Sequence, residues 1–115
     1  MREDTPSGVL RPNWFHVLVA LAQGEKHGLA IARDVLDQTD GAVRLWPATL
    51  YRTLDDMTAE GLIAERSGTD PSEEASGRRR YYGITRRGRA ELMAAAERMA
   101  GLAGIARRRL RDVPS

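Results

Sequence analysis

The sequence predicts a mainly α-helical (α+β) fold, in which three helices are followed by two short strands and one long helix. Three observations predict this order. A helical pattern begins at Pro47, stops at Gly61 and runs directly into an apolar strand pattern. A polar loop, residues 68–77, joins that strand to a second one. From Thr85 onwards, apolar residues recur with heptad spacing as far as Leu110.

Composition predicts one soluble domain with a modest core, because the chain has 115 residues of which 42% are hydrophobic and 30% charged. No apolar run approaches the roughly 20 residues that a membrane span needs. The first residues lack the basic-then-apolar order of a secretory signal, so we expect a cytoplasmic protein. The absence of cysteine excludes disulfides and cysteine-ligated zinc.

Charge is unevenly distributed along the chain. Residues 1–77 hold seven Lys/Arg against thirteen Asp/Glu, a net of −6. Residues 78–115 hold eleven arginines against three acidic residues, a net of +8. A basic half indicates a polyanionic partner such as DNA. The alternative interpretation is a solvated basic helix surface.

The first helix is expected to follow a flexible polar arm, residues 1–11, which proline and glycine interrupt. Asn13 is a candidate cap for this helix, which extends to about Gln23. Its apolar side comprises Trp14, Val17, Leu18 and Leu21.

The second helix is expected after a turn at residues 24–28 and ends at about Gln38. We expect it to bury Leu29, Ala32, Val35 and Leu36. Residues 39–41 break this helix, and residues 43–45 have the alternation of a very short strand.

The third helix carries the clearest signals. Proline is tolerated in a first helical turn, and glycine just past the last turn serves as a C-cap. Leu50, Leu54 and Met57 share one face, which we expect to be buried. The opposite face of the first two turns presents small, polar and basic side chains, namely Ala48, Thr49 and Arg52. A short helix with such an end suits the major groove, so it is a candidate DNA-reading helix.

The strands are expected at residues 62–67 and 78–84, with Tyr82 and Ile84 on one face of the second. A three-helix unit followed by two strands and a mobile polar loop is typical of a winged helix-turn-helix. Thr85 is a candidate N-cap for the last helix. Its heptad seam, which predicts a dimer interface, comprises Leu92, Ala96, Met99, Ala103, Ala106 and Leu110.

Five motifs, in this order, resemble the PadR family of bacterial transcriptional regulators over roughly residues 14–110. They are HG at 27–28, ATLYRTL at 48–54, EGLI at 60–63, RRYYGIT at 79–85 and GRAEL at 88–92. The resemblance implies a dimeric winged-helix repressor of a palindromic operator, often released by a small hydrophobic or aromatic effector. The chain's length resembles the short form of the family, with a single C-terminal dimerisation helix.

This resemblance divides the chain into an arm at 1–11, a DNA-binding winged helix-turn-helix at 12–84 and a dimerisation helix at 85–115. The candidate DNA contacts are Ala48, Thr49, Tyr51 and Arg52 of the third helix, Lys26 before the second helix, and Arg78, Arg79 and Arg80 at the base of the loop. Arg52 could instead pair with Asp55 or Asp56, and Tyr51 could serve packing alone. Because phosphates repel carboxylates, these two aspartates limit DNA contact to the first two turns.

Three further side chains have open roles. Relatives commonly carry a small capping residue where this chain has Trp46, so the cap acceptor is lost and the indole could pack on the wing or contact the DNA backbone. Trp14 is a candidate for effector binding, with core packing as the alternative. For His27, turn and cap duty is preferred to metal binding, because the only other histidine is His16.

The preferred function is a transcriptional repressor, and the alternative is a winged-helix protein-interaction module without DNA binding. An enzyme is not expected. The acid pairs Asp55–Asp56 and Glu73–Glu74 lie on a helix and in a loop, with no glycine-rich phosphate loop or nucleophile motif nearby. No cofactor or metal is predicted.

Overall fold

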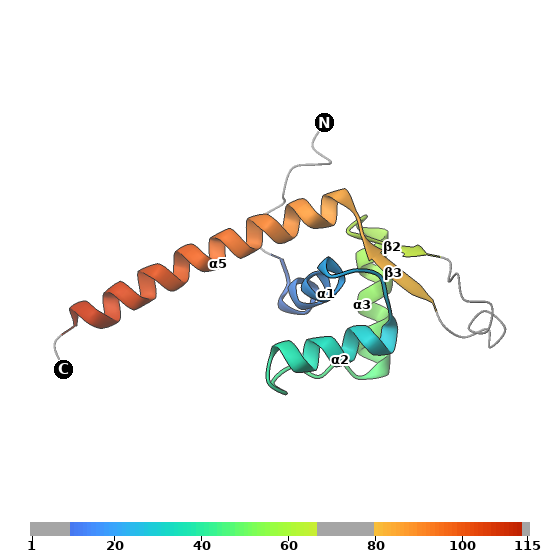
Figure 1. Cartoon of the computed structure of the whole chain (residues 1–115), viewed down its shortest axis with the longest axis horizontal. Coiled ribbons are helices and arrows are strands. Elements are labelled where there is room, and N and C mark those ends of the chain that lie inside the picture. The colour runs from blue at the N-terminus through green and yellow to red at the C-terminus, as the bar shows by residue number, and fades with distance from the viewer. Residues whose placement is uncertain (1–9, 67–79, 114–115) are drawn as a thin grey trace.

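The computed structural model describes residues 10–66 and 80–113. Three short helices pack together beside a small sheet, and one long helix extends away from them (Figure 1). In chain order the elements are α1 (Pro12–Ala22), β1 (Lys26–His27), α2 (Gly28–Gln38), α3 (Pro47–Ala59), β2 (Ile63–Arg66), β3 (Tyr81–Ile84) and α5 (Arg86–Asp112). The arrangement confirms the predicted winged helix-turn-helix with a long C-terminal helix.

The sheet has three antiparallel strands in the order β1-β3-β2. In β2, Ile63 pairs with Ile84 of β3, and Arg66 pairs with Tyr81. The prediction of a turn throughout residues 24–28 was wrong at β1, where His27 pairs with Tyr81. A strand of two residues has no periodicity of its own, because only its distant partner defines it.

The core lies where the three short helices meet the sheet. Its largest fully buried side chains come from α1, α2, α3 and the strands: Leu18, Leu21, Ile31, Leu50, Leu54, Met57, Ile63 and Tyr82. The expectation for Leu29 was wrong, since this side chain is 61% exposed. Ile31 and Val35 form the buried face of α2, and at about 100° per residue Leu29 lies on nearly the opposite side.

Helix ends follow the predicted capping chemistry at α3 and α5 but not at α1. Gly61 ends α3 with a φ of 81°, and the Thr85 hydroxyl accepts a hydrogen bond from the Gly88 amide at the start of α5. The prediction of Asn13 as a cap was wrong. The helix already begins at Pro12, whose fixed φ suits a first turn, and the N-cap residue Arg11 makes no side-chain cap bond.

The expected short strand at residues 43–45 was also wrong. The segment is not a strand, and it pairs with no strand of the described residues. Leu45 alone is buried, at 6% exposure, while Arg44 is exposed. The local alternation therefore reflects one anchoring side chain in a connection between helices.

The first turns of α5 pack closely on the body. A Cβ at Gly88 would overlap the carbonyl oxygen of Leu62, so only glycine permits this approach of helix and strand. Glu91 and Ala95 are also buried. None of the helices in residues 10–66 and 80–113 is long and apolar enough to cross a membrane.

Candidate nucleic-acid interface

The exposed face of α3 holds the residues that the sequence assigned to DNA reading. Leu50, Thr53, Leu54 and Met57 are buried against the body. In the first two turns, the exposed side chains after Pro47, which is also exposed, are those of Ala48, Thr49, Tyr51 and Arg52. Asp55 and Asp56 are exposed directly beyond them. The surface free of carboxylates is therefore limited to the N-terminal part of the helix.

Tyr51 lies against the start of α2. A Cβ at Gly28 would lie 2.7 Å from the Tyr51 hydroxyl oxygen and 2.9 Å from Cε1, so this glycine leaves room for the ring. The ring keeps 42% of its surface exposed. The contact joins α3 to the N-terminus of α2, where free amide groups favour an anion.

His27 and Lys26 precede that helix start. The His27 Nδ1 accepts a hydrogen bond from the Ala30 amide at 3.3 Å, which confirms its predicted capping role. Lys26 donates from Nζ to the Gln23 side chain at 3.1 Å on the exposed surface. Its ammonium group therefore stays available to solvent beside the start of α2.

The wing arginines are only partly described, since Arg78 and Arg79 lie outside the described residues. Arg80 is exposed, with its Nε 3.6 Å from the Glu65 carboxylate of β2. A hydrogen bond to the Tyr82 hydroxyl, followed by the charge of Glu65, raises the pKa of Arg80 above its ordinary value. Burial raises the pKa of Tyr82 as well, although Arg80 opposes this shift.

Two further residues of the wing strands, Arg66 and Tyr81, make contacts that were not predicted from the sequence. Arg66 lies 3.6 Å from Glu25, and it passes over Gly83, where a Cβ would be 2.9 Å from the Arg66 Nε. Tyr81 meets the His27 ring edge-on at a centroid distance of 5.6 Å. The position of Arg66 at the end of β2 could have indicated its contact from the sequence. The contact of Tyr81 could not be predicted, because it depends on the unpredicted strand β1.

Trp46 lies beside α2 and the connection that precedes α3. Its indole is 64% exposed and lines a shallow depression with Ala32, Arg33 and Leu36 of α2. Because an indole has no oxygen to accept a hydrogen bond, Trp46 provides no side-chain cap for α3. The position therefore belongs to the surface around the start of α3.

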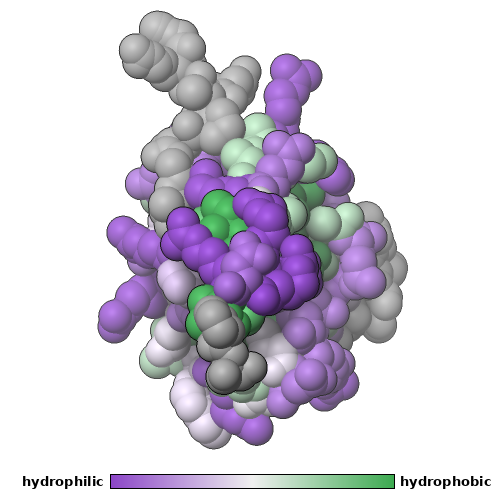
Figure 2. Space-filling model, turned by 90° about the vertical axis from the view of Figure 1, so that its left-hand side faces the viewer, coloured by the Kyte–Doolittle hydropathy of each residue, from purple (hydrophilic) through white to green (hydrophobic). Residues whose placement is uncertain are grey.

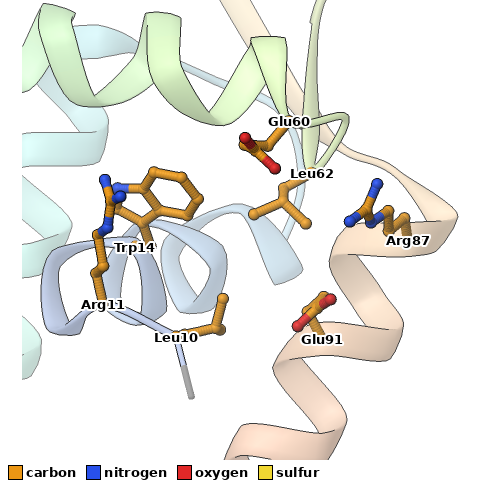
Figure 3. Close-up of a pocket in the computed structure, with 7 residues that line it drawn as sticks. All are labelled: Leu10, Arg11, Trp14, Glu60, Leu62, Arg87 and Glu91. Carbon is orange, nitrogen blue, oxygen red and sulfur yellow. The ribbon is translucent and has the colours of Figure 1, made fainter. Parts of the chain in front are cut away.

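A separate pocket of about 210 Å³ lies between the start of α1, the turn after α3 and the first turns of α5. The Trp14 indole borders this space in Figure 3, opposite the side chains of Arg87 and Glu91. The Arg11 guanidinium lies 4.6 Å from the Trp14 ring centroid. The Nε atom of Arg87 is buried and has no hydrogen-bond partner among the described residues. Trp14 thus combines packing at the core edge with a place in a polar pocket.

The distal part of α5 exposes apolar side chains on its predicted seam. Met99 is 48% exposed and Leu110 is 78% exposed, and Leu102 beside the seam is 59% exposed. Seen towards the end of this helix, apolar surface lies next to strongly hydrophilic surface (Figure 2). Within residues 10–66 and 80–113, no group of three or more His, Cys, Asp or Glu side chains could hold a metal ion.

Comparison with known proteins gives a family match and matches of fold. The model of the transcriptional regulator PadR-like family matches residues 17–94. A transcriptional regulator from Clostridium thermocellum, Cth-833, superposes with a TM-score of 0.67 at 22% identity, covering 83% of this chain and 89% of that chain. The structure of RosR from H. salinarum superposes with a TM-score of 0.63 at 24% identity, covering 80% of this chain and 76% of that chain.

The complex structure of hsRosR-S4 is similar as well, with a TM-score of 0.64 at 25% identity, covering 80% of this chain and 72% of that chain. No curated protein matches the sequence. These similarities confirm the winged-helix fold, and the family model covers more than half of the chain.

Proposed function

The chain belongs to the PadR-like family of transcriptional regulators, and on this premise we propose that it is a repressor that binds a palindromic operator as a homodimer. Family membership confirms a role in transcription regulation rather than catalysis. The single observation that carries the proposal is the carboxylate-free exposed face at the start of α3, with Arg52 as its cation.

The geometry of α3 supports direct reading of bases. A major groove about 12 Å wide admits one helix. Arg52 can donate two hydrogen bonds to guanine, and the Thr49 methyl can contact thymine. Ala48 permits close approach of the helix backbone. Since Asp55 and Asp56 would be repelled by phosphates, the N-terminal turns enter the groove and the C-terminal turns stay outside it.

Contacts to the DNA backbone would fix the orientation of α3. Tyr51 and Lys26 flank the start of α2, where a phosphate is favoured. The wing arginines Arg78, Arg79 and Arg80 would bind the backbone beside the groove. Glu65 holds Arg80 in the described structure, so a phosphate would compete with this carboxylate for the guanidinium.

Dimerisation through α5 would place two α3 helices on one duplex. The seam residues Leu92, Ala96, Met99, Ala103, Ala106 and Leu110 form the proposed interface. The exposure of Met99 and Leu110 supports it, because a second copy would cover this apolar surface. A two-fold dimer has a palindromic operator as its natural counterpart.

An effector site is proposed at the pocket that Trp14 borders. An aromatic or hydrophobic molecule could pack on the indole there, while Arg87 offers a hydrogen-bond donor. The pocket touches the turn after α3 and the start of α5. A bound molecule would therefore change how the DNA-reading helix is oriented on the dimerisation helix, which supports release of the operator.

Selection from a pool of randomised duplexes tests the proposed function. The wild-type protein is incubated with the pool, and bound duplexes are recovered, amplified and sequenced over several rounds. We expect enrichment of one palindromic sequence. An equal concentration of unlabelled random duplex should not displace this sequence from the protein. Binding without sequence enrichment would contradict a specific regulator. Absence of any duplex binding would favour the protein-interaction module.

A further inference from the structure

Trp46 occupies a position where its side chain contributes nothing to helix capping. It is the N-cap residue of α3, but an indole has no oxygen to accept a hydrogen bond from the first helical amides, and no side-chain cap bond is present. The ring is nevertheless 64% exposed. Exposure of so large a side chain at the start of a DNA-reading helix calls for a role outside the folded core.

The ring holds a neighbouring cation. The Arg44 guanidinium carbon lies 5.2 Å from the Trp46 ring centroid, within the range of a cation–π contact. Arg33 of α2 lines the same shallow depression. Unlike Arg66 and Arg80, neither Arg33 nor Arg44 forms an ion pair within 4 Å with a carboxylate of the described residues.

We propose that Arg44 and Trp46 form a phosphate-binding pair at the edge of the groove that α3 enters, in which Trp46 orients the Arg44 guanidinium. The inference rests on the proposed DNA binding and adds residues that the family resemblance did not assign. Arginine can stack on an aromatic face and still present its planar donors to a phosphate. The indole thus reduces the conformational freedom that Arg44 would lose on binding.

Position supports DNA rather than another partner. Trp46 precedes Thr49 by three residues. Along a helix this separation is a rise of about 4.5 Å, which is less than one turn. Because phosphates line both walls of a groove about 12 Å wide, a side chain at the entry of the helix lies near a wall. The unneutralised charges of Arg33 and Arg44 complement that wall, whereas an apolar protein partner would leave them uncompensated.

Fluorescence gives the direct test of proximity. The chain has two tryptophans, so Trp14→Phe leaves Trp46 as the single emitter. Acrylamide quenching of this variant is measured with and without the duplex selected by the wild-type protein, while anisotropy of a labelled duplex follows saturation. We expect DNA to shield Trp46 from the quencher. Unchanged quenching at saturation would overturn the proposal, as would an equal change in Trp46→Phe, which reports on Trp14.

Salt dependence tests the phosphate contact. Each phosphate neutralised contributes about 0.9 to the log–log salt slope, so Arg44→Gln should reduce the slope by about 1.8 for a dimer. Affinities for the selected duplex and for a random duplex should fall by similar factors. Arg109→Gln near the far end of α5 is the matched control and should leave the slope unchanged. An unchanged slope in Arg44→Gln would overturn the inference.

Double variants test the orienting role of Trp46. Trp46→Ala should weaken DNA binding although it changes no charge, and Trp46→Phe should restore part of the affinity because it keeps an aromatic face. The combination of Trp46→Ala with Arg44→Gln should cost less than the sum of the two single losses. Fully additive losses would refute the pair. If the wild-type protein binds no duplex, the proposed function and this inference both fail. If the wild-type protein binds its selected duplex and these variants bind it equally well, this inference alone fails.

Discussion

The winged-helix body and the distal part of α5, residues 96–112, differ in how far their apolar side chains are buried. In the body, Leu18 and Leu54 are completely buried within one chain. On distal α5, Met99 and Leu110 lie largely in solvent. The body therefore completes its own core, whereas the helix carries an apolar seam with no partner element among the described residues.

This difference separates two sources of stability. Tertiary packing of an apolar face supplies most of the stability of a helix in a protein. The first turns of α5 obtain it from the body, where Gly88 and Ala95 are buried. The distal turns have no such packing, so we infer that a second copy of the chain supplies it.

The largest expected effect comes from a charge on the seam. Met99→Glu would bury an unpaired carboxylate in the proposed dimer, at a cost of several kcal/mol. Sedimentation velocity should show a dimer for the wild type and a monomer for this variant. Met93→Glu replaces another exposed methionine of α5, off the seam, and should remain dimeric. A monomeric wild type at tens of micromolar would refute the interpretation of distal α5.

The same substitution at two glycines of α5 should have opposite effects. Gly88→Ala would force a Cβ onto the Leu62 carbonyl and should lower the free energy of unfolding by about 1–3 kcal/mol. Gly101→Ala meets nothing within 4 Å and should raise it by about 0.5–1 kcal/mol, because alanine favours the helix. Urea denaturation measures both. Equal losses would show that distal α5 is as closely packed as its start.

Within the body, Arg52 should distinguish base reading from backbone binding. Arg52→Ala should cost roughly 1–3 kcal/mol of binding to the selected duplex and much less to a random duplex. Titrations of both duplexes by anisotropy provide the comparison, with Arg109→Gln as the control for lost charge. If both affinities fell equally, Arg52 would be a phosphate anchor instead.

The smallest effect concerns pH and the buried phenol of the body. Burial raises the pKa of Tyr82 above its ordinary value of about 10. Its neutral form is therefore favoured in the folded state, and this stabilisation is complete below about pH 10 and is lost as the pH rises through the raised pKa.

Tyr82→Phe removes this titration together with the contact to Arg80, at a cost of about 1 kcal/mol near neutral pH. Its free energy of unfolding, measured in urea from neutral to alkaline pH, should fall less steeply above about pH 10 than that of the wild type. If the free energy of unfolding falls equally with pH in the two proteins, ionisation of Tyr82 does not cause the alkaline loss of stability.

Local signals in the sequence were sufficient to predict where the helices of this fold lie. Pro47 and Gly61 bounded α3, and Thr85 marked the start of α5, because capping depends on a few adjacent residues. The buried stripe of α3 was also confirmed. Capping and helical periodicity thus located the candidate DNA-reading surface before its environment was known.

Contacts between distant residues were beyond such signals. The strand β1 exists because Lys26 and His27 pair with β3, more than fifty residues later. The contact of Tyr51 with Gly28 likewise depends on how α2 and α3 pack. The contact of Arg44 with the Trp46 ring, beside α2, also depends on how the connection before α3 folds. Local periodicity carries no information on such pairings.

We infer that one chain holds a complete DNA-reading body and half of a dimer interface. The stoichiometry of the protein on its selected duplex, measured by sedimentation velocity with a labelled duplex, tests this most directly. We expect two chains on each palindromic duplex and loss of that complex in Met99→Glu. A stable complex of one wild-type chain with one duplex, unaffected by Met99→Glu, would contradict it.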